Sequence, residues 1–337
     1  GHEGERDRRI ALLEAPRFGI VGRDQTIRLM TFNHENFIED AMNGIMNQRI
    51  SFKMEVVVGD DFSGDNTLEK IRQYKSTSNI HIRILDRKEG DEYHSNRQKL
   101  GRLYNFYDIL KNCSGKYIAL LDGDDYWCDP LKIEKQVQFL EENQDYLFSF
   151  HDCKVFSSSG CVLKQSKLGE KRRRDWLPGQ LVQGAAMPTM SVMFRAHLVS
   201  NIPSQFFKVA NGDTFLFSYW GQFGKAGFLE SIEPGMYRVH EGGVWSKVAT
   251  AKKLENYLFT FQNLELVVSS PHKPAVRKKV SKIATTLALE YFRSRNWSKF
   301  FPSYSYAVSK CAANLNFKSI GKLHAVLLLG KSAKGNV

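Results

Sequence analysis

Three carboxylates follow one apolar stretch of the chain. Asp122, Asp124 and Asp125 come directly after residues 117–121, and Gly123 separates the first two. Like charges this close repel and raise one another's pKa unless a cation compensates them. Carboxylates are suitable ligands for magnesium or manganese, which often also hold a nucleotide's phosphates. The spacing therefore predicts a divalent cation site. The alternative is a polar turn, because Asp and Gly are common turn residues.

A second acidic pair follows the β-branched stretch at residues 54–58. Asp60 and Asp61 stand just after Gly59. A carboxylate at this point can accept a hydrogen bond from a nucleobase N–H, and uracil N3–H is the obvious donor. Turn chemistry is again the alternative. Asp65 is better explained as the cap of the helix that follows.

Alternating strands and helices must position these acids. Apolar or β-branched runs predict strands, and apolar residues at three- and four-residue steps predict helices. The expected strands are 27–31, 54–58, 80–84 and 116–121, and the expected helices are 36–48, 67–74, 99–112 and 131–143. This alternation predicts an α/β fold with a mostly parallel, Rossmann-like sheet flanked by helices. Ligands of such sheets bind beyond the carboxyl ends of the strands, where Thr31, Asn33 and both acidic groups lie.

Three motifs in this order resemble those of family 2 glycosyltransferases. They are MTFNHE at residues 30–35, VGDDFS at 58–63 and LDGDDYW at 121–127, and the resemblance extends over about residues 26–246. Members of that family are inverting enzymes with the GT-A fold. The resemblance implies transfer of a sugar from a nucleotide-sugar, expected to be a UDP-sugar, to a glycan or lipid-linked acceptor. It also implies a Mn or Mg ion and a role in surface polysaccharide synthesis.

The same resemblance assigns roles in donor binding. Thr31, Phe32 and Asn33 would belong to the nucleotide site, with Thr31 and Phe32 lining the base pocket, where a Tyr is more usual than Phe32. Asp61 would hold the base. In the third motif, Asp122 would approach the ribose or the sugar and Asp124 would bind the metal.

Further site residues are expected in the second half of the chain. Direct displacement at the anomeric carbon needs a base for the acceptor hydroxyl. Asp213 resembles the family's base, although Asp near a helix start is also a good cap. His240 resembles the histidine that contacts metal or diphosphate, and Trp245 follows a glycine pair that could act as a hinge. The alternative is a strand end for His240 and surface packing for Trp245.

Charge is concentrated at the C-terminal end. Residues 271–337 carry thirteen Lys and Arg and one acid, Glu290, whereas the rest of the chain has a net charge of zero. Such a tail predicts an anionic partner, either nucleic acid or an acidic membrane surface, or else a solvated face that aids solubility. Five cysteines without a CxxC pair favour a reducing compartment. We therefore expect a cytoplasmic protein, placed at the inner face of the membrane if the tail binds lipid.

The expected organisation has four parts. Residues 1–24 form a loose leader, 25–150 the nucleotide-sugar-binding half of a GT-A domain, 151–250 the acceptor-binding half, and 251–337 a basic helical region that Pro302 interrupts. Residues 317–329 are expected to form a last short helix. Two functions other than sugar transfer are possible for such a sequence, a sugar-nucleotide nucleotidyltransferase and a basic nucleic-acid-binding protein. A sugar-nucleotide nucleotidyltransferase would want a Gly-rich basic loop near the first strand, which residues 31–37 lack, and no nucleic-acid-binding signature supports the basic alternative.

Overall fold

The computed structural model describes residues 25–243, 248–314, 319–321 and 323–325. The expected leader, residues 1–24, lies outside this part. The chain folds as two compact units. Unit 1 comprises residues 1–176, 186–202 and 223–240, and unit 2 comprises 177–185, 203–222 and 241–337. The division of function at residues 150 and 250 stays a prediction.

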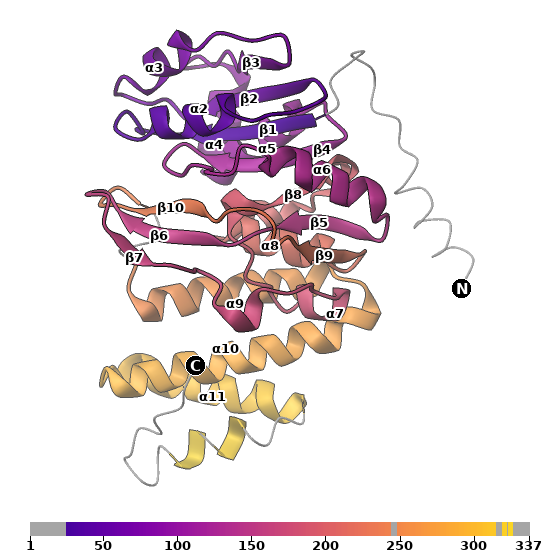
Figure 1. Cartoon of the computed structure of the whole chain (residues 1–337). Helices are drawn as coiled ribbons and strands as arrows, with labels where there is room; N and C mark the ends of the chain where they lie inside the picture. The colour runs from indigo at the N-terminus through magenta and orange to yellow at the C-terminus, as the bar shows by residue number, and fades with distance from the viewer. Residues whose placement is uncertain (1–24, 244–247, 315–318, 322, 326–337) are drawn as a thin grey trace. The chain divides into compact units, whose positions relative to one another are not determined.

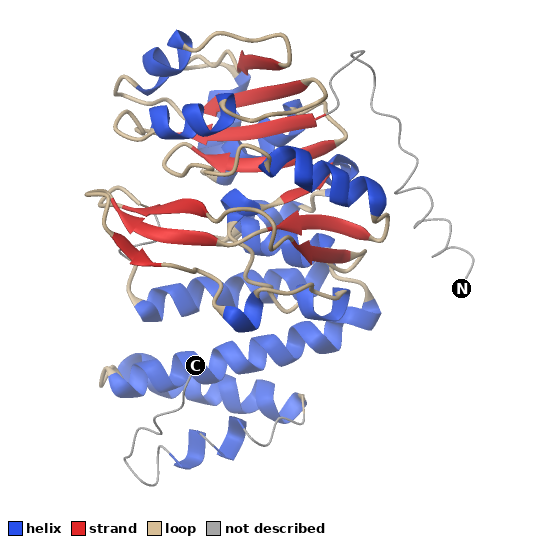
Figure 2. Cartoon of the chain, viewed as in Figure 1, coloured by secondary structure: helices blue, strands red, loops and turns tan. Residues whose placement is uncertain are grey.

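A seven-stranded sheet forms the centre of unit 1 (Figures 1 and 2). Its order is β3-β2-β1-β4-β8-β5-β9, and β8 runs antiparallel to its neighbours β4 and β5. The strands are β1 (Gln25–Thr31), β2 (Met54–Asp60), β3 (Ile80–Ile84), β4 (Tyr117–Asp122), β5 (Tyr146–Phe150), β8 (Met193–Arg195) and β9 (Lys225–Phe228). The predicted mostly parallel sheet is confirmed.

Helices cover both faces of this sheet. Side chains of α2 (Ile38–Met46) and α6 (Lys132–Glu142) share one buried apolar cluster with β1, β2 and β4. On the other face, α5 (Leu103–Asn112) packs against β1 and β2. Because successive strand residues point to opposite faces, Ile27 and Leu29 join the first cluster, whereas Arg28 faces Phe106 of α5. The remaining helices of this unit are α3 (Thr67–Gln73), α4 (Glu92–Leu100) and the 3₁₀ turns Glu170–Arg172, Thr189–Ser191 and Ala196–Asn201.

The strand register brings the polar residues to one edge. Thr31 pairs with Asp60 across β1 and β2, and Met30 pairs with Asp122 across β1 and β4. The carboxyl ends of three parallel strands therefore lie side by side, which is where the sequence placed the candidate site.

A smaller sheet completes unit 1. It has the order β10-β6-β7, from β10 (Gly235–Val239), β6 (Cys153–Ser157) and β7 (Val162–Lys164). Residues 122–125, which contain the three acids, form the acidic loop. Tyr126, which follows this loop, forms an isolated bridge with Met236 of β10, with N–O distances of 3.2 and 2.9 Å. This bridge fixes the start of β10 against the acidic loop.

Unit 2 is helical in the described residues. It contains α7 (Pro178–Leu181), α8 (Gly212–Trp220), α9 (Thr250–Val267), α10 (Lys273–Arg293), α11 (Trp297–Ala313) and the 3₁₀ turns Ser204–Lys208 and Ser270–His272. Helices α10 and α11 pack through small buried residues, Ala284, Ala288 and Ala307. None of the described helices has the length and apolarity needed to cross a bilayer.

Two sequence predictions need correction. The helix expected at 99–112 begins only at Leu103, as α5, because Gly101 has a φ of 78°, which a helix cannot include. The helix α4, which ends at Leu100, was not predicted. Pro302 does not interrupt the helical region but lies inside α11. One lost backbone hydrogen bond is outweighed there by the burial of Phe300 and Ala307. Most of the helix expected at 317–329 lies outside the described residues.

Candidate functional site

The acidic loop and the end of β10 meet in unit 1. His240 Nε2 lies 3.0 Å from Asp124 Oδ2. Burial favours a raised pKa for Asp124, but the hydrogen bond from His240 and the nearby charges of His34 and His240 outweigh it, and the pKa is lowered. Two residues far apart in sequence, both predicted for the metal site, are therefore brought together.

The other two acids of the loop lie in different environments. Burial raises the pKa of Asp122, against the opposing charge of Arg28, whose Nη1 donates to Asp122 Oδ1 at 2.7 Å. Burial and the charge of Asp124 raise the pKa of Asp125 well above its usual range. Asp125 accepts a hydrogen bond from the backbone N–H of Arg238 at 2.8 Å. It is 4 % exposed, which makes it a structural anchor for the loop.

Arg238 ties three segments of the site together. Its Nε donates to the Asp124 carbonyl at 2.9 Å, and its Nη2 forms a 2.6 Å ion pair with Asp40 of α2. Its guanidinium also lies 4.4 Å from the ring centroid of Phe156. Because His240 stands two residues after Arg238, these contacts orient the histidine towards Asp124. Sequence reasoning did not identify this role for Arg238.

His34 packs against the glycine of the loop. A Cβ on Gly123 would lie 2.7 Å from His34 Nδ1 and 2.9 Å from Thr31 Cγ2, closer than real side chains approach. Glycine at position 123 is therefore required by space. His34 Nδ1 is buried without a hydrogen-bond partner among the described residues, and its ring centroid lies 6.4 Å from that of His240. His34, which lies in the first motif, is a second histidine of the site, and no role was predicted for it.

Residues at the ends of β1 and β2 build a polar shelf. Thr31 Oγ1 donates to Asp60 Oδ1 at 2.7 Å, and Asp60 also accepts from the backbone N–H and hydroxyl of Ser63. Asn33, in the left-handed region at φ 53°, accepts at Oδ1 from Gly64 N–H. Asp60 thus holds the turn, while Phe32 beside it is 54 % exposed and presents an uncovered ring.

Asp61 is held by two residues of α4. Arg97 donates to both of its oxygens, with distances of 2.7 to 2.9 Å, and Tyr93 Oη donates to Oδ1 at 2.8 Å. Burial is the main cause that raises the pKa of Tyr93. The strongly polar helix α4 was missed because it has little apolar periodicity. Its end signals were present in the sequence, with Asp91 capping the N–H of His94 and Gly101 at the other end.

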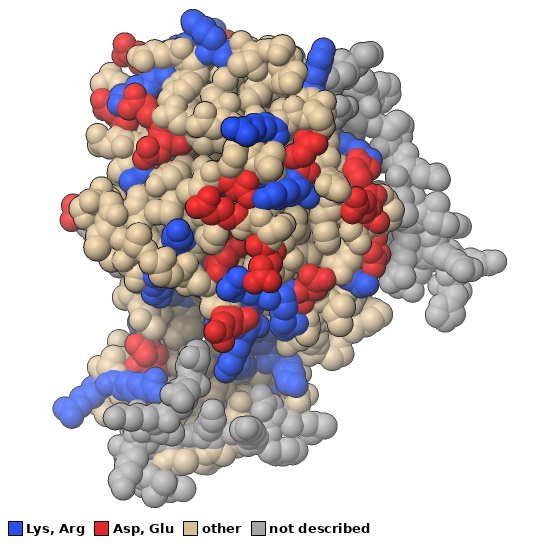
Figure 3. All heavy atoms as spheres, in the orientation of Figure 1, with Lys and Arg blue, Asp and Glu red and all other residues tan. Residues whose placement is uncertain are grey.

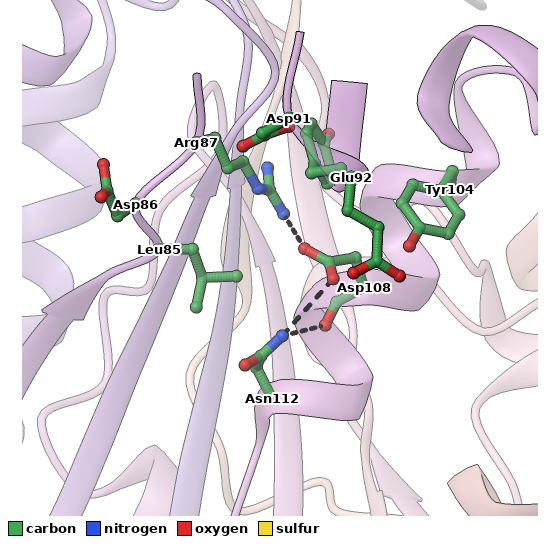
Figure 4. Close-up of a pocket in the computed structure, with 9 residues that line it drawn as sticks. Leu85, Asp86, Arg87, Asp91, Glu92, Tyr104, Asp108 and Asn112 are labelled. Atoms are coloured by element: carbon green, nitrogen blue, oxygen red, sulfur yellow. Dashed lines mark hydrogen bonds and ion pairs between the residues drawn. The ribbon is translucent and has the colours of Figure 1, made fainter. Parts of the chain in front are cut away.

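Tyr93 is one of the residues that line a cavity of about 450 Å³, which Figure 4 shows. Arg87 reaches across it to Asp108 at 2.6 Å, and its guanidinium lies 3.7 Å from the Tyr93 ring centroid. Asp86, Asp91 and Glu92 add acidic groups to its lining. Arg87 thereby supports the residue that holds Asp61.

The remaining predicted residues lie elsewhere. Asp213 is in the first turn of α8 in unit 2, where its Oδ1 accepts from Thr214 N–H at 2.6 Å. The N-cap position belongs to Asn211, so the simple cap interpretation of Asp213 is wrong. Trp245 lies outside the described residues.

The donor atoms of Asp124 and His240 suit one small divalent cation. Two adjacent ligands of an octahedral ion, each about 2.1 Å away from it, lie about 3 Å apart, close to the 3.0 Å separation seen here. Magnesium and manganese often use only one or two protein ligands and take the rest from water and phosphate. No group of three or more His, Cys, Asp or Glu side chains converges on a metal position in the part of the chain that the structure describes.

The sequence of this chain is similar to those of known proteins. The chain is 30 % identical over 226 residues to the Mycobacterium tuberculosis protein named "Uncharacterized protein Rv1520", a match that covers 66 % of this chain and 61 % of that protein. The chain thus spans less than two thirds of the length of this relative.

Two solved structures share the fold. The crystal structure of Staphylococcus aureus TarS 1–349 in complex with UDP matches with a TM-score of 0.53 at 15 % identity, over 93 % of this chain and 94 % of that one. The mannosyltransferase PcManGT from Pyrobaculum calidifontis, in complex with GDP-Man and Mn2+, matches with a TM-score of 0.52 at 15 % identity, over 95 % and 86 %. The predicted α/β fold of the GT-A type, with C-terminal helices, is confirmed.

The family model described as glycosyl transferase family 2 matches residues 26–198. This match covers just over half of the chain and includes all three motifs at the carboxyl edge of the sheet. The chain therefore belongs to glycosyl transferase family 2.

Proposed function

We propose that this protein transfers a sugar from a UDP-sugar to a glycan or lipid-linked acceptor, with inversion, in the synthesis of a surface polysaccharide. The observation that carries the proposal is the pairing of Asp124 with His240 at the same edge of the sheet as Asp61 and the shelf of Thr31 and Asp60. TarS, which shares the fold, was solved with UDP and with UDP-GlcNAc. The S. aureus TarS protein is named as a poly(ribitol-phosphate) beta-N-acetylglucosaminyltransferase.

The shelf would bind the nucleoside. Phe32 offers an exposed ring for stacking on the base, beside the backbone of Thr31 and Asn33. Asp61 would accept from the base N–H. Because Arg97 occupies both carboxylate oxygens, only their remaining lone pairs are available, and Arg97 and Tyr93 fix where these point. Asp122 would accept from a ribose hydroxyl.

Asp124 and His240 would hold the metal, magnesium or manganese. The ion would supply positive charge for the leaving diphosphate. Arg238 would keep both residues in place by holding the loop to β10.

Asp213 would act as the general base for the acceptor hydroxyl, with Trp245 contributing to the donor site. For Asp213 the support is its position in the first turn of α8, where the side chain is partly exposed and not used as the N-cap. Loss of a general base typically costs about 10²–10⁴-fold in rate. Asp213→Asn should therefore abolish most turnover and leave UDP affinity unchanged.

The basic C-terminal region would bind an anionic membrane surface from the cytoplasmic side. Trp297 and Phe301 of α11 are 47 % and 60 % exposed and their ring centroids lie 6.4 Å apart. Residues 293–313 around them carry four bases and no acid. Aromatic rings beside basic groups suit the headgroup layer of an anionic bilayer.

Vesicle co-sedimentation tests this partner. Trp297→Ala with Phe301→Ala should reduce binding to phosphatidylglycerol vesicles. Phe259→Ala, which removes a ring on α9 that is as exposed as Trp297, should not. Equal binding by both variants would contradict the membrane proposal. Salt-sensitive RNA or DNA binding in its place would favour the nucleic-acid alternative.

Incubation with radiolabelled UDP-sugars and with acceptors from a lipid extract tests the transfer itself. The anomeric configuration of the product is then determined. A product of inverted configuration, absent with Asp213→Asn, is the expected result. A product of retained configuration would contradict direct displacement. Formation of UTP and sugar 1-phosphate when pyrophosphate is added to the UDP-sugar would favour a nucleotidyltransferase.

A further inference from the structure

A charged residue stands in the middle of the central strand of unit 1. Arg28 of β1 has no exposed side-chain surface, although its neighbours Ile27 and Leu29 are apolar core residues. Arginine is almost never fully buried unless it is paired. Its guanidinium lies 4.4 Å from the ring centroid of Phe106 on one side. Stacking alone does not account for an ionised group at this depth.

The partner of Arg28 is the first acid of the loop. In the β1–β4 register Arg28 lies opposite Leu120 and Met30 opposite Asp122, so Arg28 and Asp122 share the sheet face towards α5. Arg28 Nη1 donates to Asp122 Oδ1 at 2.7 Å. Arg28 Nε and Nη2 are buried without hydrogen-bond partners in the described part of the chain. Asp122 is therefore the one hydrogen-bond acceptor of this guanidinium among the described residues.

The pair leaves half of the carboxylate available. Asp122 keeps 28 % of its side-chain surface exposed while Oδ1 is bound to Arg28. A carboxylate held through one oxygen presents the other in a fixed direction. The pair also places one positive charge beneath a loop of three acids, which reduces their mutual repulsion.

We propose that Arg28 is a positioning residue that fixes Asp122 as the acceptor for a ribose hydroxyl of the donor. This inference rests on the proposed function, because it takes the edge of the sheet as the nucleotide site. Arg28 would act through Asp122 alone and would not touch the nucleotide.

Calorimetric binding of UDP and of 2′,3′-dideoxy-UDP, in the presence of manganese, tests the proposal on the full chain. The wild type should prefer UDP, because the dideoxy nucleotide lacks the hydroxyl that Asp122 accepts. Arg28→Met should weaken UDP binding about tenfold or more, the loss expected for a hydrogen bond to a charged group, and should remove the preference for UDP. A merely structural role would weaken both nucleotides alike.

A matched control is available in the same sheet. Arg83 of β3 pairs with the buried Glu55 near the start of β2, with an Nε–Oε1 distance of 2.8 Å. Arg83→Met breaks an ion pair of similar length away from the acidic loop. It should leave the affinities for both nucleotides at the wild-type level.

A double-mutant comparison covers the case in which Arg28→Met fails to fold. Asp122→Ala should lose the UDP preference, and Arg28→Met with Asp122→Ala should bind UDP no more weakly than Asp122→Ala alone. Removing both charges avoids an uncompensated buried ion. A further tenfold loss in the double variant would overturn the proposal, as would a retained UDP preference in a folded Arg28→Met variant.

The outcomes separate this proposal from the donor site itself. If Asp122→Ala and Asp124→Asn weaken UDP binding while Arg28→Met does not, only the role of Arg28 fails. If the wild type does not bind UDP, or if all variants bind it equally, the donor site fails and the role of Arg28 fails with it.

Discussion

His151 makes unit 1 sensitive to acid. The residue follows β5 and is 1 % exposed, its Nδ1 donates to the Asp152 carbonyl at 2.7 Å, and its Nε2 has no partner among the described residues. Burial, reinforced by the charge of Lys132, lowers the pKa of His151 from its ordinary 6.5 to about 3, against the opposing hydrogen bond to Asp152 and the charge of Asp129. The folded protein therefore keeps this imidazole neutral.

The sign and size of the effect follow from this shift. Above pH 6.5 both folded and unfolded chains carry a neutral His151, and the residue has no pH-dependent effect. Below pH 6.5 the unfolded chain binds a proton at His151 and the folded chain does not. The free energy of unfolding therefore falls until the pH reaches about 3. At about pH 5 the loss in free energy of unfolding amounts to about 2 kcal/mol.

Denaturant unfolding at about pH 7.5 and about pH 5 measures this loss. Other groups titrate in the same range, so the informative quantity is the difference between wild type and His151→Gln. The variant should lose about 2 kcal/mol less stability between the two pH values. An identical pH dependence in both proteins would show that His151 is protonated in the folded state, which contradicts its burial without a second partner.

Three further substitutions test the site. Gly123→Ala should destabilise unit 1 by about 1–3 kcal/mol in denaturant unfolding, because its Cβ would lie 2.7 Å from His34 Nδ1; unchanged stability would contradict the packing. Phe32→Ala should leave stability unchanged and weaken UDP binding about tenfold or more, the value of a lost base stack; unchanged binding would exclude the ring from the base site. Arg97→Met should cost about 1.5–3 kcal/mol by leaving the Asp61 carboxylate without its cation, and nucleotide selectivity in a panel of diphosphates should relax; full selectivity would separate Asp61 from base recognition.

Sequence patterns predicted the elements that position the site better than the contacts within it. The β3 strand was predicted with its observed bounds because Ile80, Ile82 and Ile84 alternate with polar residues. The pairing of Asp124 with His240 depends on a bridge between Tyr126 and Met236, far apart in the chain. Family motifs predicted these two residues for one site, whereas local periodicity carries no information on such long-range contacts.

The site residues that the sequence did not predict were missed for related physical reasons. Arg97 and Tyr93 lie on a strongly polar helix, whose sequence has no apolar periodicity. Arg28 lies in a strand of mostly apolar residues, so its charge was not assigned a role. Each acts by holding a carboxylate that the sequence did reveal. Pro302 shows the opposite failure, since a strong local breaker was tolerated where packing between α10 and α11 was sufficient.

The carboxyl edge of the sheet is proposed to bind a nucleotide with the help of a cation. Calorimetric binding of UDP, GDP, CDP and dTDP, each with and without manganese, tests it most directly on the wild type and Asp124→Asn. On the surface of unit 1 shown in Figure 3, acidic and basic side chains are interspersed, so unspecific attraction of nucleotides to that face is not expected. We expect manganese-dependent binding of UDP that the Asp124→Asn substitution abolishes. Binding that ignores both manganese and Asp124, or no binding of any nucleotide, would contradict it.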